Sequence, residues 1–342
     1  MDKNTFTGFF LILVILVGST FLLKPNEEDL KREQLVQDSI KNAKEGRKIA
    51  IAAKPQIAVQ PKALDSATLK GPFGAALSGS EETIVLENEE LKINISSKGG
   101  RVASVELKKH KNYDQKPVVL FTAAESSFNV VLKAAGKDFS TKDLFFTASA
   151  KNLKVNKGDS SSVILSASYG ANQSVEFVYS LKGEGFKLGF DIVTKGLENV
   201  ITTSPVIYWD AVLRQKEKDL ASEQKYSGAY YKYTQSEPDR IGMTKDEKKD
   251  LGEDGKIQWI SFKQHFFSNV LIAKDGFEKA SLDVKTSPEK GIVKTYTASL
   301  TLPAKKQSYP LEFYFGPNRF NTLKDQGYDL DKLVDLGWGP LK

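Results

Sequence analysis

The chain has 342 residues and a net charge of +6, with 49 basic and 43 acidic side chains. It contains no cysteine, which excludes disulfide bonds and thiolate metal sites. Acidic and basic residues interleave along the chain, as in residues 244–256 (TKDEKKDLGEDGK). Interleaved charge of this kind is typical of a solvated loop, so we expect no nucleic-acid partner.

The first element is an apolar run near the N-terminus. Residues 4–23 carry no charge, and a helix of that length spans roughly 30 Å, the hydrocarbon thickness of a bilayer. We therefore predict a transmembrane anchor over residues 1–23. Its membrane residues are Thr5, Phe6, Phe9, Phe10, Leu11, Ile12, Leu13, Val14, Ile15, Leu16, Val17, Phe21, Leu22 and Leu23.

The run is longer than the apolar region of a cleaved signal peptide, which favours a retained anchor over a signal that is removed. The flanking basic residues argue weakly against a cytoplasmic N-terminus, because Lys24, Lys31 and Arg32 follow the run and only Lys3 precedes it. The short N-terminal flank and the large domain that follows favour the opposite orientation. We expect the N-terminus to be cytoplasmic and the rest of the chain to be exported.

Residues 24–80 separate the anchor from the patterned part of the chain. Residues 24–47 have helical character and a thin apolar stripe, which predicts a solvated juxtamembrane helix or, alternatively, a coiled-coil contact. Residues 48–80 are rich in alanine, proline, glycine and serine and show no sustained period. That composition predicts a flexible linker.

From Glu81 the pattern changes to period two. Leu91, Ile93 and Ile95 alternate with polar residues, and at least ten such alternating runs follow before residue 318, with residues 259–273 read as one apolar strand. Antiparallel strands with one apolar face pack as layered sheets. We predict a mostly β fold, with two packed sheets in one large sandwich over residues 81–318.

Helical spacing returns at the C-terminal end. One face of residues 320–338 carries a stripe of apolar side chains, and Gly327 interrupts it, so two short helices are possible. The stripe either packs on the sandwich or contacts a partner. The candidate partner-contact residues are Phe320, Leu323, Leu330, Leu333 and Val334.

No catalytic motif is recognisable, and we predict no enzyme activity, no cofactor and no metal site. Two histidines are present: His110 is expected to be exposed at a strand end, and His265 to be a structural residue of an apolar strand. A group of aromatic residues either packs at edges and loops or forms a stacking platform for a sugar or an extended peptide. They are Trp209, Tyr226, Tyr230, Tyr231 and Tyr233.

Three stretches together resemble the large periplasmic domain of YidC-type membrane protein insertases. They are residues 87–113 (ENEELKINISSKGGRVASVELKKHKNY), 259–273 (WISFKQHFFSNVLIA) and 314–339 (YFGPNRFNTLKDQGYDLDKLVDLGWG). The start, Met-Asp-Lys-Asn-Thr before an apolar run, is similar to the first transmembrane segment of the family. The acidic flank Glu27-Glu28 resembles the Bacteroidetes branch.

The resemblance implies a β-supersandwich similar to galactose mutarotases and closed by short C-terminal helices. It implies a periplasmic domain tethered to the bacterial inner membrane, with a role in inserting and folding membrane proteins, alone or with the Sec translocon. The implied partners are the lipid bilayer, nascent membrane proteins and Sec components including SecDF. In the family, the C-terminal helical region matters more to insertion than the sandwich does.

In the family, the motif that ends at Gly337-Trp338 leads into further membrane spans with a hydrophilic groove, whereas this sequence stops at Lys342. We therefore expect residues 319–342 to be a helical junction toward an insertase core that lies outside this chain. One alternative is a membrane-tethered carbohydrate-binding or mutarotase-like protein, which needs His110 or His265 in a cleft beside a carboxylate. Another is a spacer that binds nothing.

Overall fold

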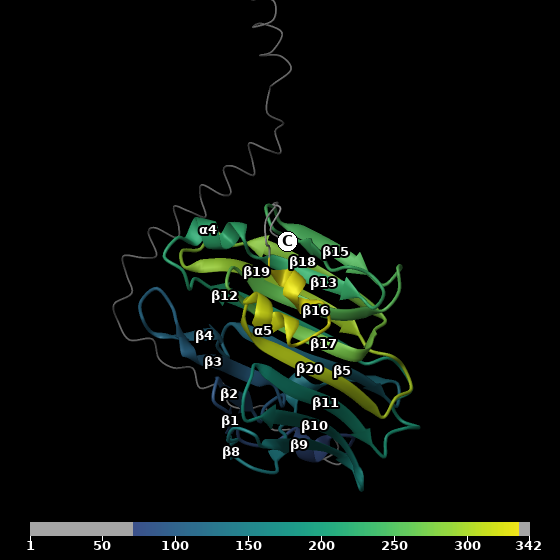
Figure 1. Ribbon diagram of the computed structural model, residues 1–342. Coiled ribbons are helices and arrows are strands. Elements are labelled where there is room, and N and C mark those ends of the chain that lie inside the picture. Colours follow the sequence, from purple (N-terminus) through teal and green to yellow (C-terminus); the bar gives the residue numbers. More distant parts are fainter. Residues whose placement is uncertain (1–70, 335–342) are drawn as a thin grey trace, which may run out of the picture. The chain divides into compact units, whose positions relative to one another are not determined.

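The computed structural model describes residues 71–334 (Figure 1). The predicted anchor over residues 5–23, the juxtamembrane helix and residues 335–342 lie outside the described residues. The chain divides into a unit of residues Met1–Ala63 and a unit of residues Leu64–Lys342, and residues 71–334 belong to the second unit. No helix formed by residues 71–334 combines the length and the apolar character that crossing a membrane needs.

Three β-sheets make up the described part of the chain. The first is five-stranded, and its strands in spatial order are β4 (Pro117–Phe121), β3 (Val102–Lys111), β2 (Leu91–Ser96), β1 (Thr83–Glu87) and β8 (Asn152–Lys154). The second is six-stranded, in the order β15 (Glu247–Leu251), β18 (Lys279–Thr286), β19 (Ile292–Thr301), β12 (Val206–Arg214), β5 (Ser126–Ala134) and β6 (Lys137–Ser140).

The third sheet is nine-stranded and positions the candidate sites. Its strands in spatial order are β14 (Asp239–Ile241), β13 (Gly228–Tyr233), β16 (Ile257–Gln264), β17 (Phe267–Phe277), β20 (Ser308–Pro317), β11 (Lys187–Lys195), β10 (Gln173–Lys182), β9 (Ser160–Gly170) and β7 (Thr147–Ala148). Neighbouring strands in it run antiparallel, as at Phe177↔Ile192 between β10 and β11. The described helices are short: η1 (Gly74–Ala76), η2 (Thr141–Asp143), α4 (Leu220–Lys225), α5 (Phe320–Lys324) and η3 (Leu330–Leu333).

The period-two pattern explains the main core. On β10, the side chains at every second position from Val175 to Leu181 are fully buried, and those between them are half-buried. One continuous hydrophobic cluster joins the inward faces of all three sheets. At its centre the ring of Phe190 lies 5.6 Å from the ring of Phe128 and 5.6 Å from that of Phe313. The prediction of one large sandwich is therefore confirmed, but with three sheets instead of two, since alternation reports a buried face and not which strands pair.

Two further expectations need correction. Residues 259–273 are not one strand but the hairpin β16–β17, with His265 and Phe266 in its turn. The folded part also begins before residue 81, because Phe73 is fully buried between Phe139 and Tyr169 at ring distances of 5.2 and 5.1 Å. Residues 71–80 thus belong to the packed domain, and the predicted linker ends earlier than residue 80.

Candidate docking surfaces beside the C-terminal helices

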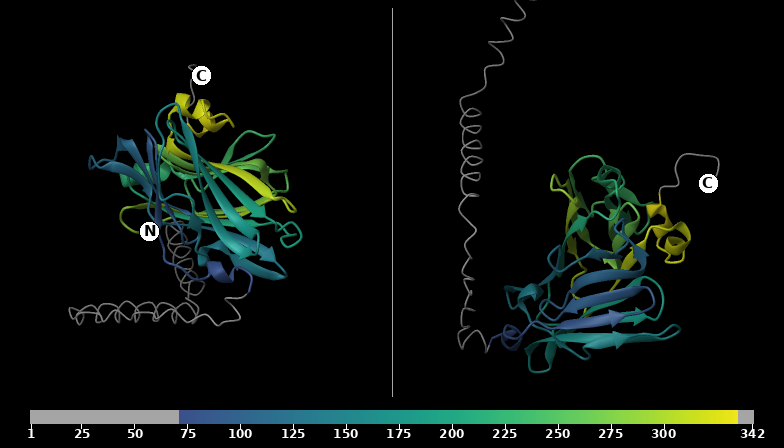
Figure 2. Two further views of the ribbon diagram at one scale, coloured as in Figure 1. Left: turned by 90° about the horizontal axis from the view of Figure 1, so that it is seen from below. Right: turned by 90° about the vertical axis from the view of Figure 1, so that its left-hand side faces the viewer.

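The two C-terminal helices cover part of the outer face of the nine-stranded sheet. Figure 2 shows them in yellow, on the outside of the strands in both views. Leu323, Leu330 and Leu333 are fully buried there, in a second hydrophobic cluster that is separate from the main core. The sheet contributes outward-facing residues of β13, β16, β17 and β20, namely Tyr230, Trp259, Val270, Ile272 and Tyr314.

Polar contacts fasten this segment to the sheet. The indole Nε1 of Trp259 donates a hydrogen bond to the carbonyl oxygen of Tyr328 at 2.8 Å. Lys187 on β11 donates from Nζ to the carbonyl oxygen of Gln326 at 3.1 Å and forms an ion pair with Glu312 at 2.8 Å. Because these bonds reach from the strands to the turn between the helices, they fix that turn as well as the helices.

The predicted partner-contact residues differ in how far the sheet buries them. The three leucines are buried, whereas Phe320 and Val334 are half-buried. Gly327, at φ 74°, separates α5 from η3, so the expected pair of short helices is present. Contact between this segment and a partner stays a prediction, and it would involve Phe320, Val334 and the polar outer side, since the leucines already contact the sheet.

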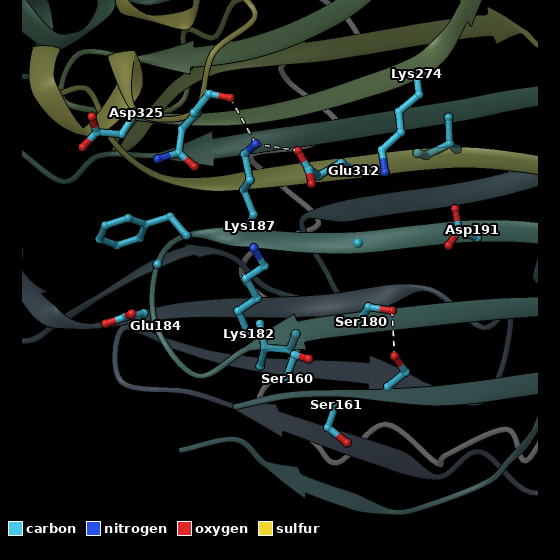
Figure 3. Close-up of a pocket in the computed structure, with 17 residues that line it drawn as sticks. Ser160, Ser161, Ser180, Lys182, Glu184, Lys187, Asp191, Lys274, Glu312 and Asp325 are labelled. Carbon is cyan, nitrogen blue, oxygen red and sulfur yellow. Dashed lines mark hydrogen bonds and ion pairs between the residues drawn. The ribbon is translucent and has the colours of Figure 1, made fainter. Parts of the chain in front are cut away.

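A polar trough lies on one side of the C-terminal helices, with a cavity volume of about 590 Å³ (Figure 3). It crosses β9, β10, β11 and β20, and small residues form part of its floor. Ser162 and Ser180 share a hydrogen bond at 2.8 Å, and Gly189 lies on the neighbouring strand β11. Charged residues of both signs line it, namely Lys182, Glu184, Lys187, Asp191, Lys274, Glu312 and Asp325. Burial raises the pKa of Asp191, and the charge of Lys274 opposes that shift. The trough could hydrogen-bond an extended polar chain, and its lining contains no histidine for acid-base work.

A second groove, of about 400 Å³, lies on the other side of the helices at the β16–β17 turn. Its lining residues are Tyr226, Lys263, His265, Phe266, Asn318, Leu333 and Val334. The ring of His265 stacks on Phe266 at 3.8 Å and on Tyr226 at 4.8 Å. Burial lowers the pKa of His265, and the nearby charge of Lys263 lowers it further, so the neutral imidazole is favoured.

Neither histidine lies beside a carboxylate among the contacts of residues 71–334. The groove that holds His265 has no aspartate or glutamate in its lining. His110, expected to be exposed, is half-buried between the rings of Phe186 and Phe267, and burial together with the charge of Arg319 lowers its pKa. The described residues also contain no cluster of three or more metal-ligating side chains. The acid-base pair that a mutarotase mechanism needs is therefore not assembled in this part of the chain.

The aromatic residues of the middle of the chain do not share one surface. Trp209 is buried in the main core, with its ring 4.3 Å from that of Phe262. Tyr230 and Tyr231 are also buried, on opposite faces of β13. Tyr226 alone among the five is exposed, and the other four pack in the hydrophobic clusters, so the five residues form no common stacking platform.

The outward-facing residues that receive the C-terminal helices were not predicted from the sequence. Trp259, Val270 and Ile272 point away from the main core, yet they are fully buried. The available signal was the nearly continuous apolar run over residues 259–273, since a strand buried on both faces loses its alternation.

Comparison with known proteins assigns the family. The family model described as the YidC periplasmic domain matches residues 83–340. This chain belongs to that family. The resemblance seen in the sequence is thereby confirmed, and the matched range includes all three sheets and the C-terminal helices.

Curated relatives carry the same family name. The membrane protein insertase YidC of Bacteroides fragilis is 36% identical over 357 residues, which cover 99% of this chain and 55% of that protein. The membrane protein insertase YidC of Parabacteroides distasonis is 32% identical over 365 residues, covering 99% of this chain and 56% of that protein. The chain thus spans about half the length of the curated relatives that it matches.

Solved structures superpose on this fold with low scores. A galactose mutarotase-like protein from Lactobacillus casei aligns with a TM-score of 0.42 and 12% identity, over 68% of this chain and 100% of that one. An α-N-acetylgalactosaminidase from Bifidobacterium bifidum aligns with a TM-score of 0.46 and 11% identity, over 71% of this chain and 38% of that one. At these scores the overlaps carry no statement about the function of this chain.

Proposed function

We propose that this chain is the N-terminal part of a membrane protein insertase that helps to insert and fold proteins of the bacterial inner membrane, alone or with the Sec translocon. In this proposal residues 1–23 anchor the chain, and residues 24–70 connect the anchor to the folded domain. The β-supersandwich then lies in the periplasm, and residues 319–342 form the junction toward the insertase core. The domain serves as an interaction or chaperone-like module for nascent membrane proteins and Sec components, including SecDF.

The observation that carries this proposal is the docking of the C-terminal helices within the range matched by the family. Three fully buried leucines and the hydrogen bond from Trp259 hold residues 320–334 against the nine-stranded sheet. The family match runs on to residue 340, and the alignment with the Bacteroides fragilis relative covers 55% of that protein. A segment held in this way sets the direction in which the following chain leaves the domain.

A chimeric protein tests the proposal. Residues 1–342 replace the matching part of the Bacteroides fragilis relative and are joined to the remainder of that protein, in cells whose own insertase is depleted. We expect the chimera to restore growth. A variant with Leu330→Asp and Leu333→Asp is expected to restore it poorly, because burying two carboxylates in an apolar cluster undocks the junction.

The matched control is Asn321→Ala, which changes an exposed residue of the same segment and is expected to leave growth intact. The proposal fails if the unaltered chimera reaches normal amounts in the membrane and still does not support growth. Mutarotase activity has no specific observation in its favour, because neither the polar trough nor the groove at the β16–β17 turn is lined by a histidine together with a carboxylate.

A further inference from the structure

We propose that the β16–β17 turn, together with Tyr226, binds the surface of a bilayer that contains anionic lipids. This inference rests on the proposed function and deepens it, because it names a lipid surface as the partner of the groove beside η3. We define the aromatic tip as Tyr226, His265 and Phe266. None of these three residues belongs to the hydrophobic clusters that hold the domain together.

The aromatic tip gathers exposed apolar surface at one place. Phe266 is 48% exposed and Tyr226 is 40% exposed, and both line the same groove, with the ring of His265 stacked between them. Phe266 belongs to a hairpin turn and Tyr226 to the end of α4, so two separate elements bring these rings together. Aromatic rings with a polar edge are enriched where proteins meet the headgroup region of a membrane.

A polar framework holds the tip in place. Asn318 donates from Nδ2 to the carbonyl oxygens of Gln264 at 2.9 Å and His265 at 3.2 Å, and its backbone N–H donates to the carbonyl of Phe266 at 2.7 Å. The buried Glu223 accepts a hydrogen bond from the amide of Gln264 and so ties α4 to β16. Three bonds from one asparagine to backbone carbonyl oxygens therefore hold the backbone of the turn that carries Phe266.

The charge around the tip suits an anionic surface. The groove has no carboxylate in its lining, and Lys263 donates from Nζ to the carbonyl oxygen of Tyr226 at 3.1 Å. Lys225, which is exposed, lies 5.7 Å from the ring of Tyr226, and the exposed Arg319 follows Asn318 in the chain. Basic side chains beside exposed aromatic rings are attracted to anionic headgroups while the rings enter the interface.

The position of the tip in the chain points to the same partner. Val334, the last described residue, lines this groove. Eight residues remain from 335 to 342, and they reach at most about 28 Å when fully extended. In the proposed function the chain then continues toward the membrane core of the insertase, which keeps the tip close to the bilayer surface.

The test uses the full chain in lipid vesicles and a tryptophan at the tip. Phe266→Trp keeps an aromatic ring at the turn, and Tyr208→Trp is the matched control, since Tyr208 is 44% exposed on β12 of the six-stranded sheet. Vesicles contain either phosphatidylcholine alone or phosphatidylcholine mixed with phosphatidylglycerol, and the acyl chains carry bromine as a quencher. The emission of the unaltered chain is subtracted, because it contains three tryptophans.

We expect the emission of Phe266→Trp to shift to the blue and to be quenched in the anionic vesicles, and that of Tyr208→Trp to remain unquenched. Added salt, or Lys225→Gln combined with Arg319→Gln, is expected to reduce the quenching. The proposal is overturned if Phe266→Trp behaves like Tyr208→Trp in both kinds of vesicle, as it would if the tip bound only a protein.

The two proposals can fail separately. The vesicles contain no nascent protein and no Sec component, so quenching at the tip does not depend on insertase activity. A chimera that fails to support growth while the tip is still quenched would refute the proposed function alone. A chimera that supports growth without quenching at the tip would refute the lipid contact alone.

Discussion

Replacing Leu330 by alanine tests whether the outer face of the nine-stranded sheet holds the C-terminal helices. The side chain of Leu330 is fully buried in a cluster with Leu333 and Trp259. Removing such a side chain costs about 2–5 kcal/mol, because the lost transfer free energy adds to the cavity that remains. For a domain of this size each kcal/mol lowers the melting temperature by about 2–4 °C, so we expect a decrease of about 4–20 °C if the segment unfolds with the domain.

The segment could also undock locally without unfolding the sheets, and the assay must detect both outcomes. We would record thermal unfolding by circular dichroism and the hydrogen exchange of residues 320–334, with Asn321→Ala as the control variant. Local undocking is expected to leave the melting temperature nearly unchanged and to accelerate exchange in this segment alone. An unchanged melting temperature together with unchanged exchange would show that Leu330 contributes nothing to docking.

Three further predictions concern the sandwich itself. Phe73→Ala is expected to lower the free energy of unfolding by about 3–5 kcal/mol in urea titrations, because two aromatic rings pack on Phe73. Pro72→Ala is the control, since it changes an exposed residue and is expected to have a smaller effect. Equal effects of the two variants would show that residues 71–80 belong to the linker. Gly100→Ala is expected to lower the free energy of unfolding by about 1–3 kcal/mol more than Gly136→Ala. Both glycines have positive φ, but only at Gly100 would a new Cβ meet a phenylalanine carbon, at 2.8 Å. A smaller loss of stability at Gly100 than at Gly136 would contradict this packing. Burial lowers the pKa of Lys294 to about 8, so the unfolded chain binds this proton between about pH 8 and pH 10 and the folded chain does not. Stability is therefore expected to rise over that range. Lys294→Met is expected to reduce the slope without removing it, because burial also lowers the pKa of Lys216 to about 8. An unaltered slope in the variant would show that Lys294 does not contribute.

The strands of the main core were the most predictable part of the fold. Leu91, Ile93 and Ile95 alternate in the sequence, and the structure places all three fully buried on β2. Alternation works there because one face of the strand contacts the core and the other contacts solvent. Gly99 and Gly100 lie between two alternating runs of the sequence, and in the structure they form a turn in which both residues have positive φ.

The β16–β17 hairpin was not predictable by the same rule. Trp259 and Ile260 are buried on opposite faces of β16, so the run has no alternation, and the exposed Phe266 gives the turn no polar signal. The candidate surfaces depend on contacts between distant parts of the chain, such as the bond from Trp259 to the carbonyl of Tyr328. Periodicity describes one segment at a time, and it therefore showed the apolar stripe of the C-terminal helices without showing what the stripe contacts.

The proposed role of this chain as part of a membrane protein insertase is tested most directly by the insertion of a newly made inner-membrane protein. Cells that depend on the chimera are pulse-labelled, and protease added from the periplasmic side measures the fraction of the new protein that has been inserted. We expect insertion close to that supported by the natural relative and a clear loss in the variant with Leu330→Asp and Leu333→Asp. Insertion that stays at the depleted level, with the chimera present in the membrane in normal amounts, would contradict this role.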